Sequence, residues 1–280
     1  MLNNVLIIGL GMMGGSLCKA IKNNKISKKI SAIDKNKLSI KYALKNNLID
    51  HEVTDFKMMK HPDLIVLCTP LSSYTTIINK LVATINKKTL LTDIGSSKGT
   101  IHKRIMKLTN NTNISFISSH PMAGSEKSGA RHHRVKMFKN KVVFIIDRDT
   151  SSKGNYLKLK NFWESMGTMT YDIDSKNHDL LMSQTSHIAH LMSYVFIESL
   201  PQSIIDKNLQ LLLGGGIKEH VRLSKSDPQM WTDIFMNNKK NILKSLIRIQ
   251  KSTTNMKKIL QSDNKIKINA FLENIQIKTK

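Results

Sequence analysis

The fold of this chain is decided by the stretch Val5-Leu6-Ile7-Ile8-Gly9-Leu10-Gly11-Met12-Met13-Gly14. Its four apolar residues predict a buried parallel strand, and the glycines that follow have the G-x-G-x-x-G spacing of a dinucleotide-binding turn. The three glycines allow a tight turn, close approach of the backbone to a pyrophosphate, and close packing of the next helix on the strand. We therefore expect a dinucleotide at the N-terminus of the helix that begins here, with residues 9–14 against its phosphates.

An acidic residue at the expected distance supports this interpretation. Asp34 lies about 20 residues beyond the third glycine, at the end of the next apolar run. A carboxylate at this place accepts hydrogen bonds from ribose hydroxyls and repels a 2′-phosphate, so NAD is favoured over NADP. Lys35 and Lys37 follow directly and could neutralise part of a phosphate charge. NADP is therefore the less favoured alternative.

Further short apolar runs alternate with longer mixed segments through the first part of the chain. They occupy residues 29–33, 64–68, 90–94, 114–117, 142–146 and 169–173. This alternation predicts buried strands joined by helical crossovers, which is the pattern of a doubly wound α/β sheet. We place a Rossmann-type dinucleotide-binding domain at residues 1–173.

The pattern changes to a helical one from about Ser175 and stays helical to the end. Residues 178–200 present two faces, one with Leu181, Ile188, Met192 and Val195, the other with Ser183, His187, His190 and Tyr194. Asp227-Pro228 suits the N-cap and the first turn of another helix. Its later apolar positions continue far enough to suggest packing against a further helix or a second subunit. We therefore expect an all-α substrate and dimerisation domain at residues 174–280.

The composition is strongly basic, with a net charge of +24 and an isoelectric point near 10.0. Only six of the 44 basic residues are arginine, and the lysines are scattered along the chain. Proteins that grip nucleic acid favour clustered arginine and exposed aromatic rings, whereas aromatic residues make up only 5% here. We expect no nucleic-acid partner and keep a basic nucleic-acid binder as a remote alternative.

The cysteines and the apolar runs bear on metal, membrane and compartment. Cys18 and Cys68 both lie in apolar runs, which excludes a disulfide framework and a cysteine-built zinc site, so no metal is expected. No apolar run approaches the ~20 residues that span a bilayer, and the N-terminus lacks the basic region of a secretion signal. We expect a cytoplasmic protein without a membrane partner.

Polar segments follow several of the predicted strands, at the sheet edge where ligands bind in open α/β folds. They are Cys68-Thr69-Pro70, residues 92–99 (TDIGSSKG) and residues 118–129 (SSHPMAGSEKSG). Together with Ser186-His187-Ile188-Ala189-His190 and the run from Gly214 to Ile234, they resemble the prephenate/arogenate dehydrogenase family of tyrosine biosynthesis. The resemblance covers nearly the whole chain, and its His-Pro-Met-Ala-Gly segment is specific.

The resemblance implies an oxidative decarboxylation. Hydride leaves C4 of a cyclohexadienol for a nicotinamide, and the ring carboxylate departs as carbon dioxide. By analogy with the family, His120 is the base that accepts the proton of the 4-hydroxyl, and Ser96 hydrogen-bonds that hydroxyl or orients the histidine. Thr69 and Pro70 are expected beside the cofactor.

The resemblance also implies a set of substrate-binding residues. Arg222 matches the family arginine that clamps the ring carboxylate, and His190 matches a substrate-side histidine. The rest of the expected set is Lys98, Gly215, Glu126 as a gating or subunit-crossing acid, and Trp231 as a wall of the pocket or of the subunit interface. His187 serves orientation or helix packing as readily as substrate contact. The family's usual aspartate before the arginine is replaced by Glu219.

The expected protein is therefore an NAD-dependent prephenate dehydrogenase that acts as a homodimer. Arogenate dehydrogenase is the nearest alternative, because arogenate differs from prephenate in an amino group that replaces a keto group. Another Rossmann-type hydroxyacid dehydrogenase is a more distant alternative, and it would release no carbon dioxide.

Overall fold

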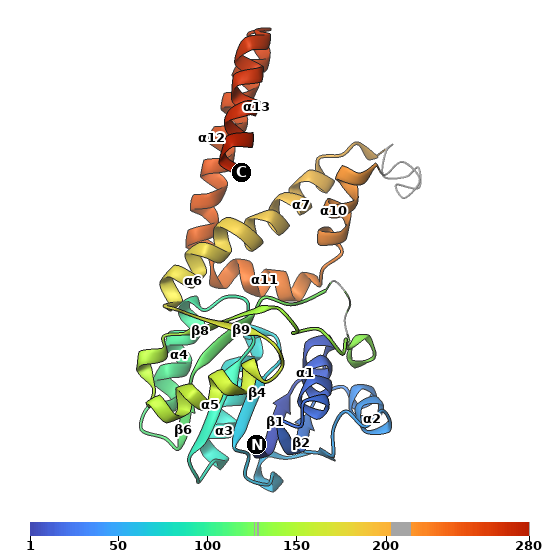
Figure 1. Cartoon of the computed structure of the whole chain (residues 1–280), viewed down its shortest axis with the longest axis vertical. Helices are drawn as coiled ribbons and strands as arrows, with labels where there is room; N and C mark the ends of the chain where they lie inside the picture. The colour runs from blue at the N-terminus through green and yellow to red at the C-terminus, as the bar shows by residue number, and fades with distance from the viewer. Residues whose placement is uncertain (126, 128, 203–213, 280) are drawn as a thin grey trace.

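The computed structural model describes residues 1–125, 127, 129–202 and 214–279, which form an α/β body and a helical extension (Figure 1). The main sheet has six parallel strands in the order β3-β2-β1-β4-β5-β6. This is the order of a dinucleotide-binding Rossmann sheet, as the sequence predicted. The strands are β1 (Leu2–Ile8), β2 (Ser27–Ile33), β3 (His51–Glu52), β4 (Leu64–Leu67), β5 (Thr89–Asp93) and β6 (Ile114–Phe116).

Helices cover both faces of this sheet, because its central strands are apolar on both sides. In β1, Val5 and Ile7 belong to one buried cluster and Leu6 and Ile8 to the other. The first cluster packs under α1 (Met12–Asn23), α2 (Lys37–Lys45) and α5 (Lys153–Glu164), and the second under α3 (Tyr74–Thr84) and α4 (Gly99–Thr109). Short 3-10 turns occupy Phe56–Met58, Leu71–Ser73, Ala130–His132 and Arg148–Thr150.

A second sheet of three strands adjoins the first, in the order β7-β8-β9. It consists of β7 (Ser118–Pro121), β8 (Val142–Ile146) and β9 (Met169–Ile173), with β7 antiparallel to β8 and β8 parallel to β9. The sequence pattern did not separate the last two strands from the main sheet, and it gave β7 as a segment after a strand. The chain in fact leaves β6 at Ile117 and enters the second sheet at once, so His120 lies opposite Phe144.

The C-terminal part is helical throughout its described ranges. It contains α6 (Ser175–Met182), a π-helical turn (Ser183–His187), α7 (Ile188–Glu198), α10 (Gly215–Ser224), α11 (Pro228–Asn237), α12 (Lys239–Gln261) and α13 (Lys265–Thr279). The predicted cap of α11 is confirmed, because the Asp227 carboxylate accepts a hydrogen bond from the Met230 N–H at 2.8 Å. The π-helical turn interrupts a continuous rod, a feature that recurs at functional sites.

The α6–α7 rod buries polar side chains and exposes apolar ones. Ser183 and His187 on the polar face are 0% and 1% exposed, whereas Leu181 and Val195 on the apolar face are 38% and 44% exposed. The rod therefore buries Ser183 and His187 of its polar face and leaves part of its apolar face outside, although Ile188 on that face is buried. Such an inversion points to a function for the buried polar groups and to a partner for the apolar ones.

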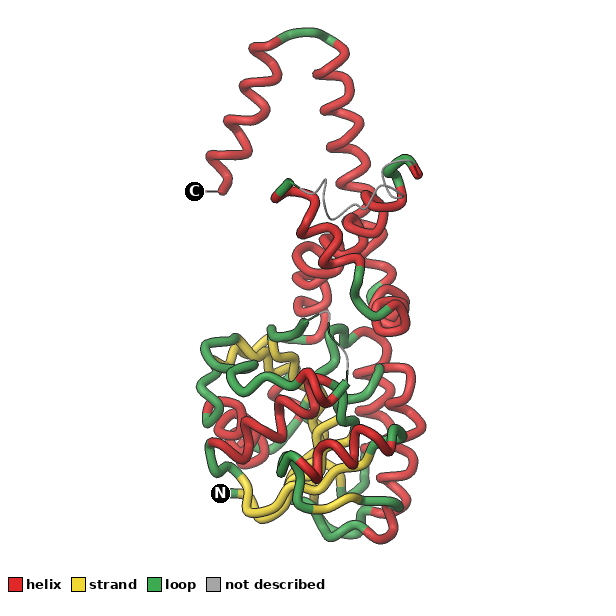
Figure 2. Tube along the Cα trace, turned by 90° about the vertical axis from the view of Figure 1, so that its right-hand side faces the viewer, coloured by secondary structure: helices red, strands yellow, loops and turns green. Residues whose placement is uncertain are grey.

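Helices α12 and α13 form a hairpin that projects from the body, as Figure 2 shows clearly. Several large apolar side chains on the hairpin are exposed, namely Leu243, Ile247, Leu260, Ile266, Leu272, Ile275 and Ile277. Across the parts of the chain that the structure describes, no helix has the length and apolar character needed to cross a membrane. Exposed apolar surface of this extent is typical of a protein–protein interface.

Candidate active site

The turn between β1 and α1 is shaped by its three glycines. Gly9 has a φ of 101°, and a Cβ there would lie 2.7 Å from the carbonyl oxygen of Cys68. A Cβ on Gly14 would lie 2.0 Å from the carbonyl oxygen of Gly9, so α1 could not approach β1 as closely. A Cβ on Gly11, in contrast, would meet nothing within 4 Å. The backbone is thus open at Gly11, where the spacing predicts a pyrophosphate.

The N-terminus of α1 is suited to an anion. Its N-cap, Gly11, provides no side-chain cap, and its first turn contains no acidic residue. Free N–H groups and the helix dipole at such an end favour negative charge. Met12 is buried and Met13 packs against the core, so the backbone is the part of this turn that faces outward. These residues therefore fit the phosphates of a dinucleotide.

Asp34 is tied to the same turn. Its carboxylate accepts hydrogen bonds from the Leu10 N–H and, at 2.7 Å, from the Asn36 N–H. A carboxylate has room for about four hydrogen bonds, so this partly exposed group keeps acceptor capacity for ribose hydroxyls. Thr69 and Pro70 follow β4 next to this turn, and the Thr69 hydroxyl accepts a hydrogen bond from Ser73 at 2.8 Å. Their contact with a cofactor stays a prediction.

His120 lies at the centre of a buried hydrogen-bond chain. The ring is 7% exposed, and its Nδ1 lies 2.9 Å from Nε2 of His178. His178 is fully buried, and its Nδ1 lies 2.9 Å from a carboxylate oxygen of Asp179. The chain His120–His178–Asp179 thus joins β7 to α6. The sequence analysis missed His178 and Asp179, whose only signal was an adjacent His-Asp pair just after the last predicted strand.

Asp179 is itself held by the backbone of another element. Its two carboxylate oxygens accept hydrogen bonds from the N–H groups of Lys98, at 2.8 Å, and Gly99. These groups lie at the N-terminus of α4, where a negative charge is stabilised. The hydrogen-bond chain from His120 therefore ends on a firmly bound carboxylate.

The environment of His120 keeps its ring neutral. Burial lowers the pKa of His120 well below its ordinary value, and the neighbouring His178 and the positive charge of Lys98 act in the same direction. Burial also lowers the pKa of His178, although its hydrogen bond to Asp179 opposes that effect. A neutral imidazole is the form that can accept a proton, so this state suits a general base.

Lys98 is buried and paired inside the protein. Its side chain is 1% exposed, and its Nζ donates to a carboxylate oxygen of Asp93 and to the backbone oxygen of Ser119, both at 2.9 Å. A buried ammonium requires such partners, because desolvation is costly. Burial lowers its pKa, and Asp93 opposes this. Lys98 therefore ties β5 to β7 beside His120, and its contact with a substrate carboxylate stays a prediction.

Ser96 and His187 are brought together beside this network. The backbone oxygen of Ser96 accepts a hydrogen bond from Nε2 of His187 at 3.2 Å. Asn238, which the sequence analysis missed, donates to Nδ1 of His187 at 3.1 Å and to the backbone oxygen of Asp179 at 2.7 Å. Both ring nitrogens of His187 are occupied, which favours its orienting role over substrate contact. Ser96 itself is partly exposed on the loop before α4.

His190 and Trp231 form a second cluster next to the first. Their rings stack with centroids 3.7 Å apart and an interplanar angle of 23°. Trp231 is 5% exposed, and within the described part of the chain its Nε1 has no hydrogen-bond partner. The ring of His187 meets Trp231 edge-on at 6.1 Å. The structure thus gathers His187, His190 and Trp231 where α6–α7 meets α11.

Arg222 faces this cluster from α10. Burial lowers the pKa of His190, and the positive charge of Arg222 acts in the same direction. The guanidinium is half exposed and makes a two-pronged pair with the carboxylate of Glu219, with one bond of 2.8 Å. Gly215 opens α10 and is exposed, with open space around it. Glu126, the expected gating acid, lies outside the described residues.

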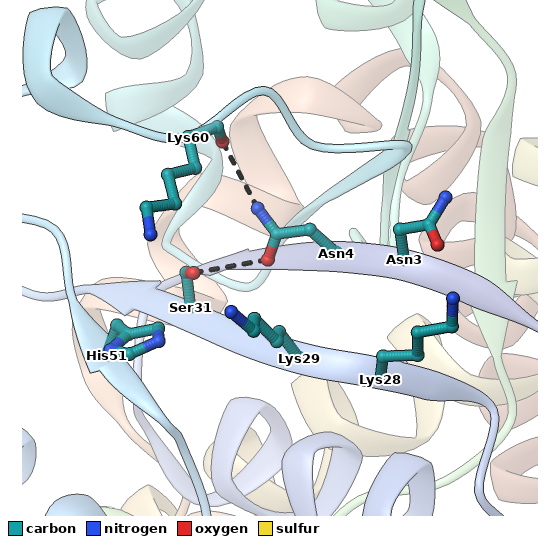
Figure 3. A pocket seen from close by; sticks show the side chains of 7 residues that line it. All are labelled: Asn3, Asn4, Lys28, Lys29, Ser31, His51 and Lys60. Atoms are coloured by element: carbon teal, nitrogen blue, oxygen red, sulfur yellow. Dashed lines mark hydrogen bonds between the residues drawn. The ribbon is translucent and has the colours of Figure 1, made fainter.

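A separate hollow lies near the ends of the strands opposite to the glycine turn. Figure 3 shows it between the beginnings of β1, β2 and β3, lined by Asn3, Asn4, Lys28, Lys29, Ser31, His51 and Lys60. The glycine turn follows the end of β1, so this hollow is not part of the site described above.

The fold and the site together define a dinucleotide-binding dehydrogenase with a buried histidine at the junction of its α/β and helical parts. Two family profiles match the chain, the nucleotide-binding domain of prephenate dehydrogenase over residues 17–171 and the dimerization domain of prephenate dehydrogenase over residues 174–274. The chain belongs to the prephenate dehydrogenase family.

Individual relatives agree with this assignment. The chain is 29% identical to a prephenate dehydrogenase of Bacillus subtilis, with 87% of this chain and 66% of the relative covered. It is 28% identical to a prephenate dehydrogenase of Lactococcus lactis, with 89% and 69% covered. The chain thus spans about two thirds of the length of these curated relatives.

The structure is also similar to solved ones. A prephenate dehydrogenase from Aquifex aeolicus, solved in complex with hydroxyphenyl propionate and NAD+, superimposes with a TM-score of 0.90 at 28% identity. That match covers 100% of this chain and 98% of the other. An arogenate dehydrogenase from Synechocystis shares the fold, with a TM-score of 0.80 at 20% identity.

Proposed function

We propose that the protein catalyses the oxidative decarboxylation of prephenate to 4-hydroxyphenylpyruvate with hydride transfer to NAD, in the cytoplasm and as a homodimer. The observation that carries this proposal is His120, a buried neutral imidazole fixed where the nucleotide-binding domain meets the helical part. The names of the Bacillus and Lactococcus relatives and the NAD+ bound to the Aquifex protein support it. The dimerization-domain match supports the homodimer, and two free cysteines suit a reducing compartment.

The nucleotide-binding domain has the residues to hold the cofactor. Residues 9–14 and the N-terminus of α1 bind the pyrophosphate, and Asp34 accepts hydrogen bonds from the ribose hydroxyls. The carboxylate of Asp34 also repels a 2′-phosphate, which favours NAD over NADP. When bound, the nicotinamide supplies the acceptor for the hydride that leaves C4 of the substrate.

His120 accepts the proton of the reacting hydroxyl and later returns it. The 4-hydroxyl becomes acidic as hydride leaves its carbon, and Nε2 of His120 accepts its proton. The ring carboxylate then leaves as carbon dioxide, and the electron pair of the broken C–C bond completes the aromatic ring. The oxygen takes the proton back from His120 and becomes a phenol. Ser96, on the neighbouring loop, helps to orient these groups.

The substrate is an anion with two carboxylates, and Arg222 is the residue proposed to clamp the ring carboxylate. Its pair with Glu219 is exposed, with side chains 49% and 62% accessible, and such pairs contribute little to stability. A substrate carboxylate can therefore take the place of Glu219 on the guanidinium fork. His190 is close enough to Arg222 for the charge of the guanidinium to act on it, and Trp231 stacks on His190. The two rings form the adjoining wall of the proposed pocket.

The test uses the purified protein with prephenate or arogenate, each with NAD or NADP, while reduced nicotinamide and carbon dioxide are both measured. We expect turnover with prephenate and NAD and equal amounts of the two products. A large preference for arogenate with NADP would contradict the substrate and the cofactor that we propose. Reduced nicotinamide without carbon dioxide would instead indicate a hydroxyacid dehydrogenase.

The role of His120 is tested by His120→Asn. We expect kcat to fall by about 10²- to 10⁴-fold, the usual contribution of a general base, while the dissociation constant for NAD stays unchanged. Arg222→Ala is the comparison, and it should chiefly raise KM for prephenate. Unchanged turnover in His120→Asn would remove this residue from its proposed role.

A further inference from the structure

A base at His120 requires a particular tautomer. Neutral imidazole has one proton on either Nδ1 or Nε2, and only the nitrogen without a proton can accept one. The Nδ1 of His120 is already engaged with His178 at 2.9 Å. His120 can therefore accept the proton of the substrate hydroxyl only if its own proton resides on Nδ1 and its Nε2 carries the free lone pair.

Asp179 determines which ring nitrogen of His178, and in turn of His120, carries a proton. Its carboxylate accepts N–H bonds from Lys98 and Gly99 and so is present as the anion, which can only accept hydrogen bonds. The Nδ1 of His178, 2.9 Å from it, must consequently carry a proton. Neutral His178 then has a lone pair on Nε2, and this lone pair faces Nδ1 of His120.

It follows that Nδ1 of His120 donates its proton to His178. We propose that His178, held by Asp179, is a positioning residue that keeps His120 in the tautomer whose Nε2 is free to accept the hydroxyl proton. The catalytic part of this proposal rests on the proposed function. The tautomer itself follows from the geometry of three buried side chains and holds for the protein without substrate.

The hydrogen-bond chain from His120 through His178 to Asp179 also stabilises His120 after it has accepted a proton. The resulting imidazolium still donates from Nδ1 to His178, which still donates to the Asp179 carboxylate. Among the residues that the structure describes, the other titratable groups that act on the His120 ring are Lys98 and His187, and both disfavour a positive ring. The charge of Lys98 is already paired with Asp93. Asp179 is therefore the group that compensates the cation, without itself becoming protonated.

Asp179→Asn is the decisive substitution. The amide that it introduces has one oxygen for three donors, the backbone N–H groups of Lys98 and Gly99 and Nδ1 of His178, so the proton of His178 is no longer fixed on Nδ1, and neither is that of His120. We expect kcat to fall by about 10²-fold or more, with the dissociation constant for NAD changed by less than about twofold. His178→Phe keeps the ring volume and removes both hydrogen bonds, and it should lower kcat to a similar extent.

The tautomer is read directly by ¹⁵N NMR of protein labelled at histidine, with His120→Asn to assign the signal. In the unsubstituted protein at neutral pH, we expect the His120 signals of a ring protonated on Nδ1. In Asp179→Asn we expect the share of rings protonated on Nε2 to rise. A resting His120 protonated on Nε2 would overturn the proposal even if neither variant folds.

A second buried His–Asp pair in the chain provides a matched control. Nε2 of His102 lies 2.9 Å from one carboxylate oxygen of Asp147, and the other oxygen accepts a hydrogen bond from the Ser175 N–H at the start of α6, which the side-chain oxygen of an asparagine can keep. Asp147 has a φ of 49°, which Asn adopts readily, so Asp147→Asn alters this pair without backbone strain. We expect its kcat to stay within about twofold of the unsubstituted value.

The outcomes distinguish the role of His178 from the proposed function. A loss of kcat in Asp179→Asn no larger than that in Asp147→Asn would overturn the role of His178. Absence of turnover with prephenate and arogenate in the unsubstituted protein would instead contradict the proposed function, and the NMR result would still decide the tautomer.

Discussion

His187 shows how strongly burial acts on the histidines of this protein. The ring is 1% exposed, and burial lowers its pKa to about 4, although the charge of Asp179 opposes the effect. In the unfolded chain the pKa is about 6.5, so the unfolded state binds more protons than the folded state between these values. The stability that comes from neutral His187 is therefore complete above about pH 6.5 and is lost as the pH falls toward 4.

We predict that His187→Gln makes the protein less sensitive to acid. Linkage gives a loss of about 2 kcal/mol through His187 between neutral pH and pH 5, which the variant would not show. Urea unfolding at both pH values measures this difference. The other buried histidines titrate in both proteins, so a comparison of the two pH dependences isolates His187. Equal pH dependence would contradict the lowered pKa.

Some functional side chains could be predicted from the sequence and others could not. His120 and Asp34 are candidates from the sequence because each closely follows an apolar run, in a pattern whose geometry is local. His178 was missed because its partner is 58 residues away, and no local pattern records that contact. The burial of Lys98 was not predicted either, since one buried lysine cannot be told from many exposed ones by residue type.

The turn between β1 and α1 combines two different uses of glycine. Gly14 lets α1 pack against β1, since a Cβ there would clash with the Gly9 oxygen at 2.0 Å. Gly11 has a φ of −71° and space around its Cα, so the fold itself does not require glycine there. Gly14 is thus needed for the packing of the fold, whereas Gly11 leaves space where we propose that the cofactor binds.

We predict opposite results for alanine at these two positions. Gly14→Ala should cost about 1–3 kcal/mol of stability, since the backbone must shift, and it should lower Tm by several degrees. Gly11→Ala should cost less than about 1 kcal/mol, but it should weaken NAD binding, because the methyl group occupies the side open to the pyrophosphate. Thermal unfolding and NAD titration of both variants measure the two effects. Unimpaired NAD binding in Gly11→Ala would contradict the proposed cofactor position.

The strands of the main sheet were predictable to the extent that they are apolar. Strands β1, β4 and β5 are buried on both faces, and their sequences contain the apolar runs Val5–Ile8, Leu64–Leu67 and Leu90-Leu91. Strand β3 has only two residues and gives no such run. Strand β7 reads Ser-Ser-His-Pro, a composition typical of turns, and its hydroxyls are buried because Asp93 and Thr92 bind them. Tertiary contacts therefore decided what local preference could not.

The whole chain is an α/β body joined to a projecting helical hairpin (Figure 1). The two parts also meet through a hydrogen bond of 3.0 Å from the Ser72 N–H to Asp233, which joins the loop after β4 to α11. The exposed apolar residues of α12 and α13 and the exposed side of α7 have the character of a subunit interface. This agrees with the dimerization-domain match over residues 174–274.

We predict that Ile247→Glu weakens the dimer. Ile247 on α12 is 64% exposed in the single chain, and a charge in an apolar interface must be desolvated. The dissociation constant of the dimer should rise at least about tenfold, as measured by sedimentation across a concentration series. Lys251→Glu, one turn further along the same helix, introduces the same side chain as a control and should have a smaller effect. Equal dissociation constants for the two variants would contradict an interface centred on the apolar side chains.

The long spans of chain between the bonded groups of the site have a consequence for how the protein folds. The His120–His178 bond joins residues 58 apart, the Lys98–Asp179 bond residues 81 apart, and the Ser72–Asp233 bond residues 161 apart. Closing such loops is slow compared with forming helices. Helix signals should therefore recover first when the protein refolds, and enzymatic activity should return in a later phase, when α6 and α11 dock on the body.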